Sequence, residues 1–237
     1  MKLSVIIPCY NDGSRIEKTL FDVSNYLTKQ DFDFEVIIVD DGSTDDSKEK
    51  IEKMINKWPQ FQVIGYKENK GKGAAIAFGV KHCKGNKILF MDADQSTPIS
   101  QFEQFKQFLT AYPVIIGSRY LRRGYIKIKQ PFWRIFFARS ANLLIRLMLG
   151  LKLTDTQCGF KMFETSIAKK IFAKMTLNRW GFDFEILLIA KKMGLEIKEV
   201  PVFWYNERRS KVRPKDFLRT LGELWQVRKN LKKGKYD

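Results

Sequence analysis

The chain has 237 residues, is 44% hydrophobic and carries a formal net charge of +17, which fits one large domain with an ample core. One histidine, His82, argues against a histidine-based metal site or a serine–histidine triad, and three widely spaced cysteines argue against a disulfide framework. The cysteine pattern therefore favours a reducing cytosol. Arginines interrupt the most apolar later region, residues 132–151, so we expect a chain that crosses no membrane.

Strand and helix signals alternate through residues 1–118. Apolar runs predict strands at residues 3–10, 34–43, 61–67, 87–94 and 113–120. Helical spacing of apolar residues predicts helices at 14–30, capped by Ser14, and at 44–58, 71–83 and 98–112. This alternation predicts an α/β fold with a doubly wound, mostly parallel sheet that binds its ligand at the carboxyl ends of the strands.

The pattern of residues 119–237 is less regular. We expect one or two amphipathic helices at 131–151, a strand or loop at 155–163, helices at 164–176 and 182–194, a strand at 195–205 and a basic helix at 215–232. No linker separates the two halves, so we interpret residues 1–237 as a single domain.

The positive charge is confined to the second half. Residues 1–118 hold 15 Lys and Arg against 16 Asp and Glu, whereas residues 119–237 hold 28 against 10. Such a field attracts nucleic acid, anionic lipid or a polyanionic ligand, and charge alone does not choose among them.

Acids, glycines and a few other polar residues collect where the predicted strands end. They are Pro8, Tyr10, Asp40, Asp41, Gly42, Gly71, Gly73, Asp92, Asp94, Gly117, Ser118 and Arg119. These carboxylates have almost no neighbouring cation in the sequence, and a hard divalent ion, Mg²⁺ or Mn²⁺, would supply the missing charge. We therefore interpret Asp92 and Asp94 as a metal–diphosphate site; the alternative for a D-x-D pair alone is two solvated turn acids.

A glycine-containing segment supports a phosphate ligand. "NKGKGAAI" (69–76), which contains Gly71 and Lys72, follows a strand and precedes a helix, where backbone N–H groups can face phosphate. It matches neither the dinucleotide fingerprint nor the Walker A loop. Asp40 ends a strand, where its carboxylate can accept hydrogen bonds from a base or a ribose. We include Asp41, Gly71 and Lys72 among the expected nucleotide-sugar-binding residues.

Seven segments together resemble family 2 glycosyltransferases, especially dolichyl-phosphate β-glucosyltransferases and their bacterial polyprenyl-phosphate counterparts. The segments are "SVIIPCYND", "IIVDDGSTDDS", "NKGKGAA", "FMDAD", "DTQCGFKMF", "RWGFDFE" and "VPVFWYNERRSKV". The resemblance spans residues 3 to about 213. It implies a GT-A fold and an inverting, metal-dependent transfer of a hexose, glucose first, from a UDP-sugar to a polyprenyl or dolichyl phosphate.

The resemblance also implies roles for individual residues. Pro8, Tyr10 and Asp40 would hold the base and ribose. Asp92 and Asp94 would hold ribose and metal, with Asp94 the surer metal ligand. The remaining implied residues face phosphate, sugar or acceptor: Arg119 and Lys211 at the phosphates, and Asp183 and Glu185 near the sugar and acceptor.

Three features depart from the family pattern. Arg209 replaces the usual glycine before Ser-Lys, Asn206 replaces the usual acid after the tryptophan, with Glu207 one place later, and the membrane spans of many relatives are missing. The missing spans put the mode of membrane attachment in question.

The acceptor decides whether a catalytic base is needed. An anionic lipid phosphate needs no strong base, whereas a sugar hydroxyl acceptor would need Asp183 or Glu185.

The basic half predicts peripheral attachment to an anionic membrane, on its inner, cytoplasmic face. Residues 125–151 combine arginines with Phe132, Trp133 and Phe136, which can enter the headgroup boundary, and the carboxyl-terminal helix would assist. The alternative is a core helix pair with snorkelling arginines. On this interpretation residues 1–118 form a nucleotide-sugar-binding half and residues 119–237 an acceptor- and membrane-facing half.

Other functions stay open at this stage. The donor could be GDP-mannose or UDP-N-acetylglucosamine, and the acceptor could be a hydroxyl. A basic protein that binds nucleic acid or anionic lipid without catalysis fits the charge, but the chain has no nucleic-acid motif and its cations mix with long aliphatic runs, so we expect no nucleic-acid partner.

Overall fold

The computed structural model describes residues 1–122, 125–126, 132–205 and 214–237; the side chains of residues 132–138 and 214–217 lie outside that description. In this described part, seven strands form one sheet in the spatial order β3-β2-β1-β4-β6-β5-β7. The strands are β1 (Lys2–Cys9), β2 (Asp33–Asp41), β3 (Phe61–Tyr66), β4 (Lys87–Phe90), β5 (Val114–Ser118), β6 (Lys161–Glu164) and β7 (Ile197–Pro201).

The sheet is parallel except for β6, which runs antiparallel between β4 and β5. Its first residue, Lys161, pairs with Phe90 at the end of β4 and with Ile116 near the end of β5. Because β6 is reversed, the segment that precedes it arrives at the edge where the parallel strands end. The predicted mostly parallel α/β fold is confirmed, and residues 155–163 turn out to contain both alternatives, a loop and then a strand.

The helices agree with most predicted ranges. They are α1 (Ile16–Leu27), α2 (Ser47–Ile55), α3 (Lys72–His82), η1 (Ile99–Phe102), α4 (Glu103–Lys106), α5 (Phe132–Leu149), α6 (Thr165–Lys174), α7 (Phe182–Lys192) and α8 (Pro214–Lys232).

Two predicted details of the helices were wrong. The helix expected over 98–112 is a 3₁₀ turn followed by the four-residue α4, and its continuation makes i→i−3 hydrogen bonds such as Phe108 N to Phe105 O, 2.9 Å. Ser14 does not cap α1; the N–H groups of Arg15 and Ile16 donate to Asp12 O instead, each at 2.9 Å.

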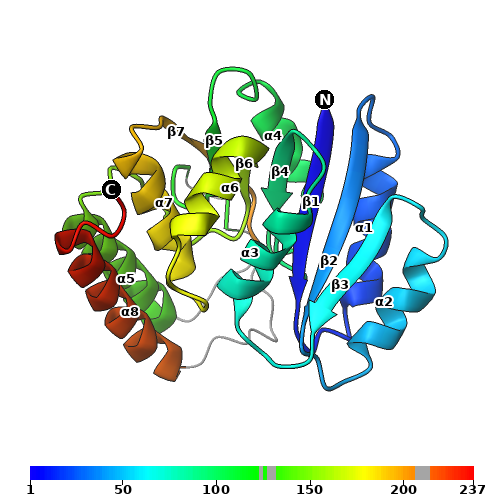
Figure 1. Cartoon of the computed structure of the whole chain (residues 1–237), viewed down its shortest axis with the longest axis horizontal. Coiled ribbons are helices and arrows are strands. Elements are labelled where there is room, and N and C mark those ends of the chain that lie inside the picture. Colours follow the sequence, from blue (N-terminus) through cyan, green and yellow to red (C-terminus); the bar gives the residue numbers. More distant parts are fainter. Residues whose placement is uncertain (123–124, 127–131, 206–213) are drawn as a thin grey trace.

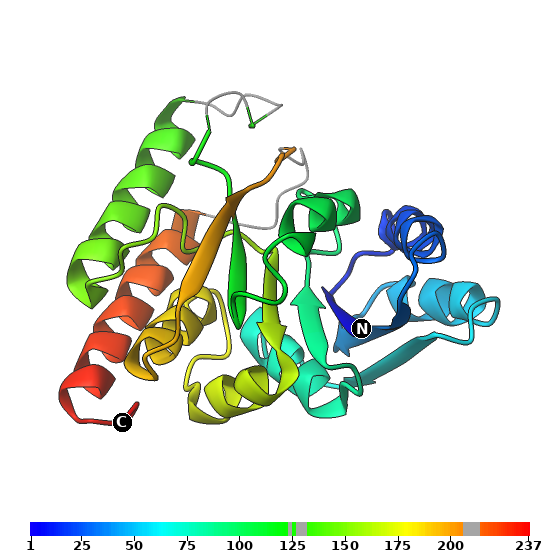
Figure 2. The same ribbon diagram turned by 90° about the horizontal axis from the view of Figure 1, so that it is seen from above.

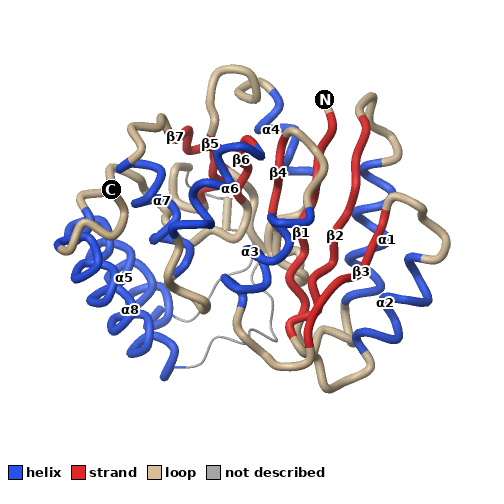
Figure 3. Tube along the Cα trace, in the orientation of Figure 1, coloured by secondary structure: helices blue, strands red, loops and turns tan. Residues whose placement is uncertain are grey.

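Helices cover both faces of the sheet, which is the middle layer in Figure 3. The alternation of side chains along a strand divides the core. Val5 and Ile7 pack on the face covered by α1, α2 and α4, whereas Ile6 packs on the face covered by α3, α6 and α7. The carboxyl ends of β1, β2 and β3 lie at the lower edge in Figure 1.

Two helices of the basic half extend the fold beyond α7. Figures 1 and 2 show α5 and α8 side by side at one end of the molecule. Both contribute to the core, α5 through Ile145 and Leu149 and α8 through Leu224 and Val227. None of the described helices has both the length and the apolarity that a membrane span requires.

Candidate active site

The acidic turn after β4 lies at the carboxyl edge of the sheet. Met91 N donates to Ile6 O at 3.1 Å, so the turn begins directly beside β1. Gln95 adopts a left-handed conformation with φ 51°, and Ser96 N donates to Asp94 Oδ1 at 2.9 Å. Thr19 Oγ1 from α1 donates to Ala93 O at 2.6 Å. The turn is therefore fixed from both sides, which places Asp92 and Asp94 together at the edge.

Asp92 has a cationic partner, which corrects the expectation that these acids lack one. Lys72 Nζ forms an ion pair with Asp92 Oδ1. Burial opposes the charge on Lys72, but Asp92 and Asp183 outweigh it and raise the pKa of this lysine above its usual range. The pair was invisible in the sequence because Lys72 begins α3, twenty residues earlier.

At Asp94, in contrast to Lys72, the surroundings disfavour the charged form of the side chain. Burial, and then the charge of Asp92, raise the pKa of Asp94 above its ordinary value, and the hydrogen bonds from Ser96 do not offset this. No group of three or more metal-ligating side chains gathers in the described residues. Mg²⁺ commonly binds one or two carboxylates and completes its shell with water and substrate phosphate, so the Asp92–Asp94 pair fits a metal–diphosphate ligand.

Asp41 shapes the glycine-containing loop before α3. Its carboxylate accepts hydrogen bonds from Tyr66 Oη and Asn69 Nδ2, both at 2.8 Å, and from Lys70 N and Gly71 N, both at 2.9 Å. Four donors occupy its oxygens. The geometry gives this predicted nucleotide-binding residue a supporting position beneath the loop.

Gly71 joins this loop to a second one. It has φ +105°, and a Cβ there would lie 2.6 Å from Asn178 O. Ala74 N donates to the same oxygen at 3.1 Å. Only glycine permits this backbone conformation and this approach. Residues 178–182 are thereby packed against the first turn of α3, beside Lys72.

The residues predicted to hold base and ribose lie on two adjacent strands. Cys9 pairs with Asp40 across β1 and β2, so Pro8, Tyr10 and Asp40 share one stretch of the edge. Asp40 is buried and accepts a hydrogen bond from Ser43 N at 3.1 Å, whereas Tyr10 is exposed. An exposed aromatic ring at this edge suits stacking on a base.

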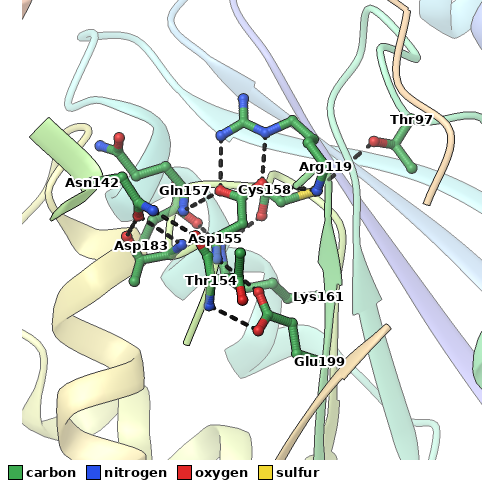
Figure 4. Close-up of polar contacts among 11 residues, drawn as sticks. Thr97, Arg119, Asn142, Thr154, Asp155, Gln157, Cys158, Lys161, Asp183 and Glu199 are labelled. Carbon is green, nitrogen blue, oxygen red and sulfur yellow. Dashed lines mark hydrogen bonds and ion pairs between the residues drawn. The ribbon is translucent and has the colours of Figure 1, made fainter. Parts of the chain in front are cut away.

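Arg119 is held by a residue to which the sequence analysis gave no role. Its Nε and Nη2 donate to the two oxygens of Asp155 at 2.7 and 2.8 Å (Figure 4). Asp155 is fully buried, which would raise its pKa, but Arg119 outweighs burial and lowers it. The guanidinium also lies 5.6 Å from the ring centre of Trp204. Arg119 therefore has a fixed orientation at the end of β5.

The loop that carries Asp155 is anchored by α5 and β7. Glu199 accepts hydrogen bonds from Thr154 N and Asp155 N at 2.8 and 2.7 Å. Asn142 donates to Thr154 O at 2.5 Å and accepts from Thr156 Oγ1 at 2.8 Å. These contacts, most of them drawn in Figure 4, connect α5 directly to the site.

Asp183 belongs to the site's charge network and Glu185 does not. Lys161 Nζ forms a buried ion pair with Asp183 and also donates to Cys158 O at 2.7 Å (Figure 4). Glu185, predicted near sugar and acceptor, has no exposed surface. Its carboxylate accepts from Thr176 Oγ1, Leu177 N and Tyr236 Oη at 2.6, 2.8 and 2.6 Å, which ties the carboxyl-terminal segment to α7.

Lys211 and its neighbours Asn206, Glu207 and Arg209 lie outside the described residues. Two charged residues that the sequence analysis did not assign, Asp155 and Lys161, both lie in the quoted segment "DTQCGFKMF". The sequence could have drawn attention to these two residues only because their segment is one of the seven that carry the family resemblance. Their position at the edge of the sheet depends on the reversed direction of β6.

Comparisons with known proteins identify relatives of this chain. The family described as "Glycosyl transferase family 2" matches residues 4–172. A dolichyl-phosphate beta-glucosyltransferase of Trichomonas vaginalis is 34% identical over 95% of this chain and 72% of its own length. The enzyme of the same name from Mus musculus is 33% identical over 90% of this chain and 70% of its own length.

Solved structures share the fold. Glucosyl-3-phosphoglycerate synthase of Mycobacterium tuberculosis, in complex with UDP, superposes with a TM-score of 0.69 at 18% identity and covers 96% of this chain and 80% of its own. The same enzyme has been crystallised with Mn²⁺, UDP and glucosyl-3-phosphoglycerate. Mannosyl-3-phosphoglycerate synthase of Rubrobacter xylanophilus superposes with a TM-score of 0.71 at 14% identity, over 99% of this chain and 75% of its own.

Proposed function

Because the chain belongs to glycosyl transferase family 2, we propose that it transfers a hexose, glucose in the first place, from a UDP-sugar to a polyprenyl or dolichyl phosphate with inversion at the anomeric carbon. The observation that carries this proposal is the acidic turn Asp92–Asp94 beside Lys72, at the sheet edge where α/β folds bind nucleotides. The named relatives with about one-third identity support the donor and acceptor.

The donor would lie across the ends of β1, β2 and β4. Tyr10 and Asp40 would contact base and ribose, with Pro8 shaping the strand end. The backbone N–H groups of Lys72 and Gly73, at the start of α3, would face the diphosphate. Asp92 and Asp94 would hold Mg²⁺ or Mn²⁺, which when bound supplies positive charge to the diphosphate as it leaves.

The acceptor needs orientation more than activation. A lipid phosphate is already anionic at neutral pH, so its oxygen can attack the anomeric carbon without a strong base as the bond to UDP breaks. Arg119, held by Asp155, and Lys211 would keep the two phosphate groups close. Asp183 would stay beside the sugar as the partner of Lys161, and Glu185 would act as a structural anchor.

The membrane would meet the protein at α5 and α8. Large apolar side chains are exposed on both helices: Leu147 is 72% exposed, Leu218 74% and Trp225 68%. Arg228 Nη1 donates to Met148 O near the carboxyl ends of both helices, which run side by side in the same direction (Figures 1 and 2). Exposed apolar residues in a half with 28 Lys and Arg against 10 Asp and Glu suit an anionic bilayer.

Phe132, Trp133 and Phe136, the aromatic residues first predicted to enter the headgroup boundary, begin α5; their side chains lie outside the described part. Asn142, on the same helix, holds the Asp155 loop. A bilayer-bound α5 would thus bring the headgroup level next to Arg119, where an acceptor phosphate could arrive without leaving the membrane.

A panel of sugar nucleotides tests the proposal. Wild-type protein is incubated with each of UDP-glucose, UDP-galactose, UDP-N-acetylglucosamine and GDP-mannose, with Mg²⁺ or Mn²⁺ and a short-chain polyprenyl phosphate. We expect a glucosyl lipid phosphate with UDP-glucose, and none with Asp94→Asn. Asp31→Asn, at an exposed acid far from the site, is the matched control. Transfer to a hydroxyl acceptor in preference to the lipid phosphate would contradict the acceptor.

A further inference from the structure

The ion pair between Lys72 and Asp92 occupies the carboxylate assigned to the metal. We propose that Lys72 is a resident counter-ion: it neutralises Asp92 in the free protein and must leave it before a divalent ion binds, so that metal and nucleotide bind together and metal alone binds weakly. This inference rests on the proposed function, because it concerns the same donor site.

The packing fixes the lysine in place. Its side chain is only 15% exposed, and its Nζ lies 5.8 and 5.9 Å from the ring centres of Trp180 and Phe182. Asp94 and Asp183 add attraction for the ammonium group. The contact with Asp92, the charges of Asp94 and Asp183 and the two rings all favour this position of the ammonium in the free protein.

Asp92 is fixed on its other side. A Cβ at Gly159 would overlap Asp92 Oδ2, so the backbone of the segment before β6 lies directly against this carboxylate. Both carboxylate oxygens lie within 2.8 Å of the position that a Cβ at Gly159 would take, and Oδ1 also pairs with Lys72. The short aspartate side chain is thus packed against this backbone, and the lysine, on its longer side chain, is the group that moves.

A nucleotide diphosphate gives Lys72 a new partner. Lys72 is the first residue of α3, so its side chain starts beside the N–H groups that would face the diphosphate. Moving the ammonium from a carboxylate to a phosphate oxygen keeps it paired and releases Asp92 for the metal. Metal without nucleotide would instead leave a mostly buried ammonium without its ion-pair partner, which is unfavourable. Metal and nucleotide thus favour each other's binding through one side chain.

Mn²⁺ binding measures this coupling without any turnover. Free Mn²⁺ is titrated by electron paramagnetic resonance against wild type, Lys72→Met and Lys72→Arg, each with and without UDP. Lys81→Met, at the exposed carboxyl end of α3, is the control that removes one positive charge from the same helix. Thermal melts establish that each variant is folded.

We expect Lys72→Met to bind Mn²⁺ alone about tenfold or more tightly than wild type, and to lose most of the gain that UDP gives wild type. Lys72→Arg, which keeps the charge, and Lys81→Met should bind Mn²⁺ alone as weakly as wild type. If Lys72→Met binds Mn²⁺ alone no better than wild type, while UDP still promotes binding to wild type, the inference is overturned. If wild type binds no Mn²⁺ even with UDP, the proposed metal-dependent function fails first.

Discussion

Apart from Asp92, which pairs with Lys72, the acidic side chains at the edge of the sheet are held differently in the two halves of the chain. In residues 1–118, Asp40, Asp41 and Asp94 accept hydrogen bonds from backbone N–H groups. In residues 119–237, Asp155 and Asp183 are buried against cationic side chains, Arg119 and Lys161. A backbone donor brings no opposite charge to a carboxylate, whereas a buried ion pair is already neutral.

The charged residues of the basic half fall into two groups, those in buried ion pairs and those that make up the positive excess. Each buried pair contributes one positive and one negative charge, so the pairs add nothing to the excess of Lys and Arg over Asp and Glu in residues 119–237. The excess therefore belongs to the rest of that half, where it can act on a charged surface. The buried ion pairs orient side chains of the site, and the excess cations are available to contact a charged surface.

The largest expected effect is the loss of a ligand acid from the first half. Asp94→Asn should lower turnover on the order of a thousandfold. It removes the charge of a metal ligand, and a bound metal stabilises the charge that develops in the transition state by several kcal/mol. Stability should not fall, since burial and Asp92 already disfavour the ionised form of Asp94. Steady-state transfer and thermal melts measure both. Wild-type transfer at saturating Mg²⁺ would rule out the metal role.

The corresponding change in the second half should act on folding. Asp155→Asn leaves the Arg119 guanidinium without its charged partner, and breaking a buried pair in this way lowers the free energy of unfolding by about 3–5 kcal/mol. Urea unfolding monitored by fluorescence measures it. A variant as stable as wild type but slow in transfer would make Asp155 a purely catalytic group and would break the comparison.

The same pair predicts a pH dependence. Arg119 lowers the pKa of Asp155 below its ordinary value of 3.8, so the stabilisation is fully present above that value and is lost as the pH falls through the lowered pKa in the folded protein. Unfolding midpoints of wild type and Asp155→Asn should therefore converge only in strong acid. Convergence already near neutral pH would mean that Asp155 is not ionised in the folded state.

The exposed apolar side chains of α5 and α8 predict a smaller, lipid-dependent effect. Replacing Leu147, Leu218 and Trp225 with Ser should weaken binding to anionic vesicles at least about tenfold, because it removes apolar groups that would enter the bilayer. Activity on long-chain lipid should fall, and activity on a short acceptor should survive. Phe21→Ser, which removes a 54% exposed side chain from α1, is the matched control.

A parallel replacement of Phe132, Trp133 and Phe136 by Ser tests the first turns of α5 in the same assay. Vesicle co-sedimentation and transfer are measured for both triple variants. Equal loss of activity on the long and the short acceptor would assign these side chains to the core rather than to the membrane surface.

The smallest expected effect distinguishes an anchor from a catalyst. Glu185→Gln keeps the shape but weakens the hydrogen bonds from Thr176, Leu177 and Tyr236, which should lower stability by about 1–3 kcal/mol. Turnover of the folded fraction should stay within a few fold of wild type. A large loss of turnover with an unchanged melting temperature would restore Glu185 as a catalytic candidate.

Much of the first half could be predicted from the sequence, because its contacts follow strand order. Parallel strands joined by helices bring their carboxyl ends to one edge, so the proximity of Tyr10, Asp40 and Asp92 required only that each stretch be recognised as a strand. The resemblance then suggested what those residues bind. The sequence could not show that Asp41 is occupied by the loop of residues 66–71, since that depends on side-chain direction.

Only the tertiary structure decided how the second half joins the site. β6 enters the sheet in reverse between β4 and β5, and this brings Asp155 to Arg119 and Lys161 to Asp183 across 36 and 22 residues of chain. Local periodicity carries no information on strand direction, and it cannot pair a lysine at the start of α3 with an aspartate after β4. The sequence determined which charges the protein possesses; the order of strands in space determined which of them neutralise one another and which remain for ligands and surfaces.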